Sequence, residues 1–400
     1  MEMSSYGWTY LSRDALRRAE NQLSGAGEGV RDEIGFLIVH QRYADHFFPG
    51  TSVLHTRLRY VLFVPWIYQT LYEEGSSGRV QDSLEKAEIR LAGRLKHLRG
   101  AIGGFNFPRP TSQPASLSYW AALGAWGILR ETDGRLPSRA QIHALLQSRH
   151  RKAKDDDGQA LLRAELPFTT LPPRPDDWSS AGPTQFRLLS REAEFLQWQF
   201  ADLCPNDAPG QKSLFAKLSA APRTQADACW SPGIVEIAGD DGARLRRARH
   251  AASLAAVGRA VYAALVETLK EEVDRQTVSR KHRDNLAKVL EDHASMAGRL
   301  ELGKLIEDTR TITATIPPVL YAVLETTLAW IADGANDPMV LRDVYERGEC
   351  DRKQHRARLS RVFGASRRME WDNDLHPGAE PLHYRWRQVS GLLDDLWDAA

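Results

Sequence analysis

Two arginines lie inside an apolar stretch near the N-terminus. The stretch FPGTSVLHTRLRYVLFVPW spans residues 48–66 and places Arg57 and Arg59 among leucines, valines and phenylalanines. A guanidinium group that leaves water needs a paired carboxylate or a bound anion. The stretch therefore predicts either an ion pair that holds the fold together or a site for a ligand that is not protein.

The helical period indicates which of these arginines is the more buried. Side chains two residues apart on a helix point about 200° apart, so the two guanidinium groups cannot both face one partner. Arg57 falls on the apolar stripe, and we expect it to bond a carboxylate from residues 27–47. The candidates there are Asp32, Glu33 and Asp45. The alternative is a phosphate site formed by Arg57, Arg59 and the backbone amides after Gly50 at a helix N-terminus.

Basic and aromatic residues are interleaved near the C-terminus. ERGECDRKQHRARLSRVFGASRRMEW spans 346–371 and HYRWRQ spans 383–388, while RLRRARH at 244–250 adds further positive charge. Cations bind the phosphates of nucleic acid and aromatic rings stack on its bases, so we predict an exposed nucleic-acid site. Its expected residues are Arg352, Lys353, Arg356, Tyr384, Arg385 and Trp386. A solvated helix face that neighbouring acids partly neutralise is the structural alternative.

Other catalytic and cofactor chemistry has little support in the sequence. HQRYADH at 40–46 lacks the histidine spacing that a metal site needs. GTS at 50–52 is not a GxSxG nucleophile elbow, and the chain contains neither a phosphate loop nor a dinucleotide fingerprint. We therefore expect no catalytic residue, no metal and no cofactor. A nuclease whose acids converge only in the fold stays open as an alternative.

The composition is that of an ordinary soluble globular protein. The 400 residues are 42% hydrophobic and 26% charged, and the net charge is +1, so a nucleic-acid site would have to come from local clustering. The three cysteines are far apart and no apolar leader begins the chain. No uncharged apolar run reaches the roughly 20 residues of a membrane span. These features predict a cytoplasmic protein without a membrane segment.

Helical periodicity runs through most of the chain and predicts a mainly α-helical, two-lobed bundle with little or no β-sheet. We expect an N-terminal lobe over residues 1–150 and a C-terminal lobe over 186–400. Between them, residues 151–185 combine a charged run with many prolines and predict an irregular linker or strap. GIVEIAG at 233–239 is the one candidate strand.

The most apolar predicted helix lies within LSYWAALGAWGIL at 117–129. Its positions 119, 122, 123 and 126 form one stripe at helical spacing. Tryptophan favours large buried cores or flat recognition surfaces, and this chain has eleven. We expect Trp120 and Trp126 to lie mostly buried in the core.

An ordered set of short motifs runs along almost the whole chain. FPGTS followed by TRLRY and FVPW is the most specific of them. The others are GWTYLS at 7–12, RDEIG at 31–35, IGG at 102–104, SYWAALGAWGI at 118–128, LLSREAEFLQ at 188–197, DRKQHRARL at 351–359 and YRW at 384–386. With these motifs the chain resembles a family of bacterial proteins of unknown function. The resemblance implies no assigned activity, but genes of that family tend to lie near helicases, methyltransferases and other phage-defence genes.

These features together predict a non-catalytic accessory subunit of a bacterial anti-phage defence system. It is expected to bind nucleic acid or a nucleic-acid-processing enzyme such as a helicase or methyltransferase. Two alternatives stay open, a phosphodiester-acting enzyme and a protein-interaction scaffold. The accessory-subunit hypothesis requires basic segments on one surface. The enzyme hypothesis requires acids that converge near Arg57, and the scaffold hypothesis requires an exposed apolar patch.

Overall fold

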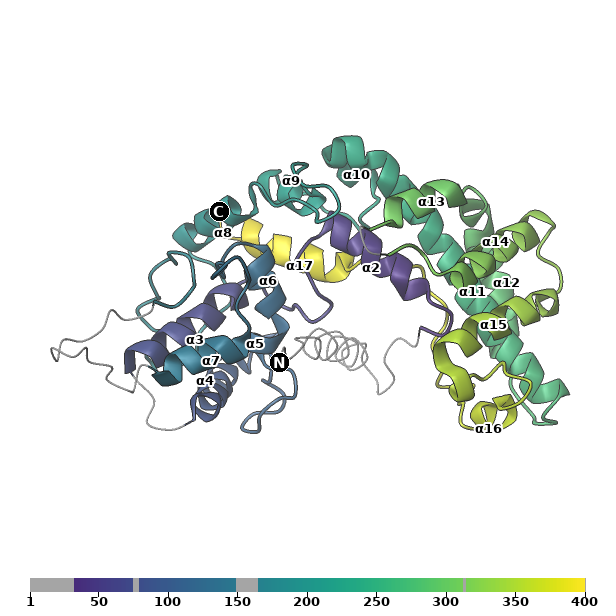
Figure 1. Ribbon diagram of the computed structural model, residues 1–400, viewed down its shortest axis with the longest axis horizontal. Helices are drawn as coiled ribbons and strands as arrows, with labels where there is room; N and C mark the ends of the chain where they lie inside the picture. Colours follow the sequence, from purple (N-terminus) through teal and green to yellow (C-terminus); the bar gives the residue numbers. More distant parts are fainter. Residues whose placement is uncertain (1–31, 75–78, 149–164, 312–313, 400) are drawn as a thin grey trace, which may run out of the picture. The chain divides into compact units, whose positions relative to one another are not determined.

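The computed structural model describes residues 32–74, 79–148, 165–311 and 314–399. Over these residues the chain is mainly α-helical and forms no strand, as the helical periodicity predicts (Figure 1). The β-type pairing in this part of the chain is limited to two isolated bridges, Leu129 with Phe168 and Thr132 with Arg135.

The candidate strand at 233–239 is wrong, because this segment forms helix α10, Pro232–Ala238. Pro232 lies in the first turn, where a helix does not need the N–H that proline lacks. The amides of Ile234 and Val235 both donate to the carbonyl of Ser231, which closes that turn. A short apolar run fits a strand or a helix by composition alone, and here the proline and the first-turn bonds favour the helix.

The chain forms two compact units, each assembled from separate stretches of sequence. The described part of unit 1 comprises residues 47–224 and 385–399, with the gaps given above. The described part of unit 2 comprises residues 32–46 and 225–384. The lobes expected from composition divide the chain differently, because residues on both sides of the proline-rich segment belong to unit 1.

Unit 1 is built around helix α3, Tyr60–Glu74, whose residues from Tyr60 to Tyr68 are all buried. A helix that is covered on every side has no polar face, which accounts for the continuous apolar run in this sequence. The other helices of the unit are α4 Val80–Leu95, α5 Ala115–Ser118, α6 Trp120–Ala125, α7 Arg139–Ser148, α8 Ser190–Phe200, α9 Leu214–Ala220 and α17 Trp386–Trp397.

The described part of the proline-rich segment, 165–185, is irregular and packs against unit 1. The ring of Trp178 stacks on that of Phe63 in α3, with centroids 5.8 Å apart. The guanidinium of Arg94 in α4 donates to three backbone carbonyls between residues 177 and 182. The segment is therefore a strap across unit 1, and its composition does not mark a boundary between units.

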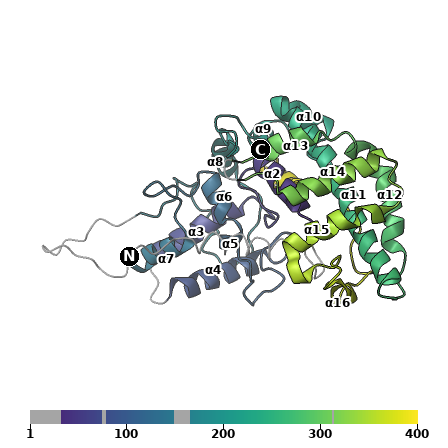
Figure 2. The ribbon, with the colours of Figure 1, turned by 45° about the vertical axis from the view of Figure 1, so that its right-hand side comes forward.

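Unit 2 is built around helix α11, Gly242–Glu272, which has 31 residues and lies alongside α12 (Figures 1 and 2). Small residues in α11 allow close packing, since a Cβ at Gly258 would lie 2.3 Å from the ring of Phe36. The other elements are α2 Phe36–Phe47, α10, the 3-10 turn Gly239–Asp241, α12 Lys281–Ala297, α13 Leu302–Thr309, α14 Pro318–Ala332, the 3-10 turn Pro338–Leu341, α15 Arg342–Lys353, the 3-10 turn Gln354–Arg356 and α16 Gly364–Met369.

One helical stretch in the described residues, Pro232–Glu272, is long and apolar enough to cross a membrane by length and composition. The rest of the protein buries 94% of its most apolar window. The core helix of a globular unit has the same length and composition, so burial within unit 2 accounts for the apolar sequence of α11.

The expectation for the two tryptophans is confirmed for Trp126, which is 1% exposed. Its ring stacks on Phe215 with centroids 5.7 Å apart and an angle of 9° between the planes. Its Nε1 donates to the carbonyl of Pro49 at 3.0 Å. Trp120 is partly buried, less completely than Trp126, and its ring N–H donates to the carbonyl of Pro137.

Trp126→Ala should lower the free energy of unfolding by about 3–5 kcal/mol, because it leaves a cavity beside Phe215. Urea denaturation followed by far-UV circular dichroism measures this loss. Trp198, which is 73% exposed, supplies the matched control, and Trp198→Ala should leave stability nearly unchanged. Equal stability of the two variants would contradict the core assignment.

Candidate nucleic-acid interface

Arg59 is the buried arginine of the 48–66 stretch. It binds Glu192 of α8 through two hydrogen bonds, Nε to Oε2 at 2.9 Å and Nη2 to Oε1 at 2.8 Å. Its Nη1 also donates to the carbonyl of Gln185 at 2.8 Å. Arg59 is 2% exposed and Glu192 is 0% exposed. Each buried charge thus has a bidentate partner, which is the condition for burying it without a large penalty.

Arg57 is the more exposed arginine, and its partner differs from the one expected. A third of its side chain is accessible, and its Nε and Nη2 bond Asp395 of α17 at 3.0 and 2.6 Å. The expected partner from residues 27–47 is therefore wrong, as is the greater burial of Arg57. The helical period does not apply here, because residues 48–59 are irregular and α3 begins at Tyr60. Carboxylates neutralise both guanidinium groups, so neither arginine offers an uncompensated charge to the alternative phosphate site.

The six residues predicted to bind nucleic acid do not form one exposed surface. Tyr384 is 0% exposed, Trp386 is 4% exposed and Arg385 is 7% exposed. The Tyr384 hydroxyl donates to the carbonyl of Ala248 at 2.7 Å, and the Trp386 ring lies 5.9 Å from that of Phe48. A buried ring cannot stack on a base. The predicted exposure of these three residues is therefore wrong, because their apolar and hydrogen-bonding groups complete the cores of the units.

The basic residues of this predicted site are also arranged differently. Arg352 and Lys353 form ion pairs with the adjacent acids at 32–33. Helix α15 ends at Lys353, and Gln354 has a left-handed φ of 51°. This turn takes the exposed Arg356 off the helical face. The expected line of charge along one helix is thus interrupted by the helix end and neutralised by the acids.

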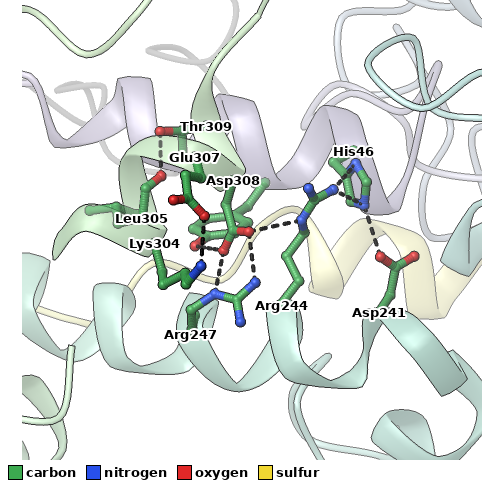
Figure 3. Close-up of polar contacts among 10 residues, drawn as sticks. His46, Asp241, Arg244, Arg247, Lys304, Leu305, Glu307, Asp308 and Thr309 are labelled. Carbon is green, nitrogen blue, oxygen red and sulfur yellow. Dashed lines mark hydrogen bonds and ion pairs between the residues drawn. The ribbon is translucent and has the colours of Figure 1, made fainter. Parts of the chain in front are cut away.

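A network of charged groups joins α2, α11 and α13 in unit 2 (Figure 3). Asp308 accepts hydrogen bonds from Arg244 and Arg247 at 2.7–3.2 Å. The Nε2 of His46 lies 3.1 Å from the carboxylate of Asp241, and Arg244 contacts the same imidazole. The acids and arginines around the imidazole carry opposite charges, and their contacts join the three helices. Over the described residues, no group of three His, Cys, Asp or Glu side chains is placed to hold a metal ion.

Exposed aromatic and basic side chains do occur together in a loop that follows α4. We term residues 96–111, KHLRGAIGGFNFPRPT, the basic–aromatic loop. Phe105 is 103% exposed and Phe107 is 38% exposed. The exposed cations of the loop are Lys96, Arg99 and Arg109. None of the three forms an ion pair with a carboxylate of the described residues, so their charge is available to a ligand.

Bonds to the 48–66 stretch hold the first part of this loop. The Thr56 hydroxyl donates to the carbonyl of Gly100 at 2.7 Å, and the amide of Ile102 donates to the Tyr60 hydroxyl at 2.7 Å. Gly100 has a φ of +92°, and a Cβ there would lie 2.9 Å from the Arg57 side chain. The stretch that carries the two arginines thus also positions the basic–aromatic loop.

Phe107 anchors the second part of the loop on α4. Gly93 makes room for the ring, because a Cβ at this position would lie 2.5 Å from it. The Nζ of Lys96 lies 4.9 Å from the centroid of the same ring, at the distance of a cation–π contact. Phe105, two residues earlier, is left fully exposed and forgoes the roughly 1.5–3 kcal/mol that burial of such a side chain contributes.

A pocket of about 80 Å³ lies between α4, the basic–aromatic loop and the start of α7. Its ionisable and hydroxyl-bearing residues are Tyr60, Glu85, Glu88, Arg109, Thr111 and Arg139. The Oε1 of Glu88 accepts a hydrogen bond from the amide of Ser116 at 2.8 Å. Burial raises the pKa of Glu88 above its ordinary value, although the bonds from Ser116 and the charge of Arg139 oppose the shift.

Two more titratable groups lie beside Arg139. The Tyr68 hydroxyl lies 3.1 Å from Nε2 of His143. Burial raises the pKa of Tyr68 to about 12, while burial and then the charge of Arg139 lower the pKa of His143. Tyr68 and His143 do not line the pocket but Glu88 does, and a shifted pKa at a pocket is typical of binding and catalytic sites. This pocket therefore joins the basic–aromatic loop as a candidate for function.

The sequence contains a pattern that marks this loop, and a count of basic residues alone misses it. Residues 89–130 contain no acid and six basic residues, namely Arg90, Arg94, Lys96, Arg99, Arg109 and Arg130. The C-terminal run at 346–371 is richer in arginine, but acids are interspersed in it and neutralise part of its charge. Arg94 still pairs with the distant Asp177, but the lack of acids close in sequence is consistent with the unpaired cations of the loop.

Arg59→Ala should destabilise the protein by about 3–5 kcal/mol, because it leaves the Glu192 carboxylate buried without its partner. Chemical denaturation measures the loss. Arg57→Ala, at a site one-third exposed, should cost clearly less. The double variant Arg59→Leu/Glu192→Leu should recover much of the stability that Arg59→Ala loses. If the two single variants are equally destabilised, the assignment of Arg59 as the main structural arginine is incorrect.

Glu88→Gln should alter how stability depends on pH. Burial raises the native pKa of Glu88, so the native state keeps a proton that the unfolded state has already released. The stability gained in this way is fully present below the unfolded pKa and is lost as the pH rises through the native pKa. Glutamine stays neutral and still accepts from Ser116. The melting temperature of the variant, relative to wild type, should therefore rise between about pH 4 and about pH 8, and a difference independent of pH would refute the shift.

The family comparison covers most of the chain. A family model described as a family of unknown function, DUF6361, matches residues 3–302. The match includes the 48–66 stretch, the basic–aromatic loop and Glu192. No curated protein and no solved structure has significant similarity to the chain. The chain therefore belongs to the family of unknown function DUF6361.

Proposed function

We propose that this protein is a nucleic-acid-binding, non-catalytic accessory subunit of a bacterial anti-phage defence system, and that the basic–aromatic loop of unit 1 holds the nucleic acid. The observation that carries the proposal is Phe105, a fully exposed ring among cations that no described carboxylate neutralises. The defence context rests on the family resemblance alone. Such a subunit would act in the cytoplasm.

Electrostatics makes the loop a suitable contact for phosphates. The net charge of the protein is only +1, so long-range attraction is weak and binding depends on local cations. Lys96, Arg99 and Arg109 supply three charges within 16 residues of sequence. If each contacts one phosphate of a single strand, log Kobs should fall with log salt with a slope of about −2.

The exposed phenylalanine favours a single strand over a duplex. A paired base has its faces covered by its neighbours, while an unpaired base offers a face to an aromatic ring. Phe107 and Gly93 fix the loop, which presents Phe105 without a large ordering cost on binding. Stacking on one base contributes roughly 1–3 kcal/mol and tolerates any sequence.

A second candidate function is the binding of a partner protein through unit 2. Large apolar side chains are exposed at Val362, Phe363, Met369 and Leu375, with exposed fractions of 79%, 52%, 67% and 77%. Their close spacing in sequence favours an interaction role over chance exposure. A nucleic-acid-processing enzyme such as a helicase or methyltransferase is the partner that the family resemblance suggests.

Fluorescence anisotropy with short labelled oligonucleotides tests the nucleic-acid proposal. Wild type should bind a single strand more tightly than the matching duplex, and binding should weaken as salt is raised. Phe105→Ala should weaken single-strand binding by roughly 1–3 kcal/mol, because the stacking platform is removed. Lys96→Glu/Arg99→Glu should abolish binding at low salt and flatten the salt dependence.

Two variants in unit 2 serve as matched controls. Met369→Ala removes an exposed apolar side chain and Lys288→Glu reverses an exposed charge, and neither should change the affinity. Melting temperatures should show that every variant is folded. No binding by wild type at low salt, or equal binding by Phe105→Ala and wild type, would reject the loop as the site and leave partner binding as the preferred function.

A further inference from the structure

The pocket beside the basic–aromatic loop carries charges of both signs. Glu85 and Glu88 come from α4, Arg109 comes from the loop, and Arg139 is the first residue of α7. The volume of about 80 Å³ is small compared with the roughly 300–1,000 Å³ of pockets that enclose a whole ligand. It therefore suits one edge of a ligand whose remaining part lies outside.

The balance of charge limits the chemistry of that edge. An anion would approach two carboxyl groups, and a cation would approach two guanidinium groups, so neither is favoured. A neutral group that carries hydrogen-bond donors next to acceptors satisfies both kinds of side chain. The edges of nucleobases have this pattern of N–H donors with ring nitrogen and carbonyl acceptors.

We propose that the pocket receives the edge of one unpaired nucleobase from the strand bound at the basic–aromatic loop, an inference that rests on the proposed function. Arg109 connects the two sites, because it belongs to the loop and to the lining of the pocket. The bond from the Ser116 amide holds the Glu88 carboxyl in place. Glu88 then bonds an N–H of the base, and Arg139 donates to a ring nitrogen or carbonyl.

The ionisation of Glu88 is compatible with this role. Burial raises its pKa, so the neutral carboxyl persists to a higher pH than in an exposed glutamate. The carboxyl group accepts a hydrogen bond in its ionised form, and in its neutral form it both donates and accepts, so either form bonds an N–H of a base edge. In contrast to stacking on Phe105, this contact depends on the edge of the base and not on its face.

The test distinguishes binding of the base edge from stacking on the base and from contact with the phosphates. Anisotropy titrations compare a single strand with an abasic strand of the same length, for wild type, Phe105→Ala, Glu88→Gln and Phe105→Ala/Glu88→Leu. Wild type should bind the base-bearing strand at least roughly tenfold more tightly than the abasic strand. Phe105→Ala should retain a preference of roughly two- to tenfold, the effect of one net hydrogen bond. The double variant should lose the preference entirely.

Glu88→Gln keeps the acceptor for Ser116 and should remain folded, and it should reduce the preference without removing it. If Phe105→Ala binds base-bearing and abasic strands equally, stacking alone recognises the base and the pocket inference is overturned while the proposed function stands. If the double variant keeps the preference, Glu88 is not the contact and the inference also fails. If wild type binds neither strand, the proposed function and this inference fall together.

Discussion

Arg59 and Glu192 place two opposite charges in the interior of unit 1, and neither charge is stable there alone. Their bidentate contact, with the further bond to Gln185, joins the segment before α3 to α8. This contact constrains the chain on both sides of the proline-rich strap. Because a buried ion pair costs desolvation, its main effect is to select one arrangement of these segments, since any other arrangement leaves a charge buried without a partner.

The same segment positions the part of unit 1 that we assign to nucleic acid. Arg57 of this segment donates to Asp395 and the Thr56 hydroxyl donates to the carbonyl of Gly100, while the Tyr60 hydroxyl at the start of α3 accepts from the amide of Ile102. Groups of the 48–66 stretch therefore hold the first part of the loop after α4, while Phe105 stays exposed. A rigid support that presents an exposed ring is the arrangement a binding loop requires, because less freedom is lost when the ligand arrives.

Unit 2 shows that part of a basic sequence can form ion pairs within the fold. Arg244 and Arg247 in α11 bind Asp308, and Arg358 after α15 binds Glu33. Arg368 binds Asp274 in the same way. In these places arginine joins helices, a role for which its planar group with several donors is well suited. Other arginines of unit 2, such as Arg246, Arg249 and Arg356, are exposed, as are the apolar side chains near α16.

The helical class of the protein and the burial of Trp126 followed from the sequence, because helical periodicity and apolar composition are local properties that near neighbours decide. The sequence also indicated that the 48–66 stretch holds buried arginine. Only the tertiary structure decided that Arg59 is the deeper arginine and that its partner lies 133 residues away. It also decided that Tyr384 and Trp386 are buried while Phe105 is exposed. Pairing and exposure depend on segments brought together from distant parts of the chain, and no local pattern of charge or ring contains that information.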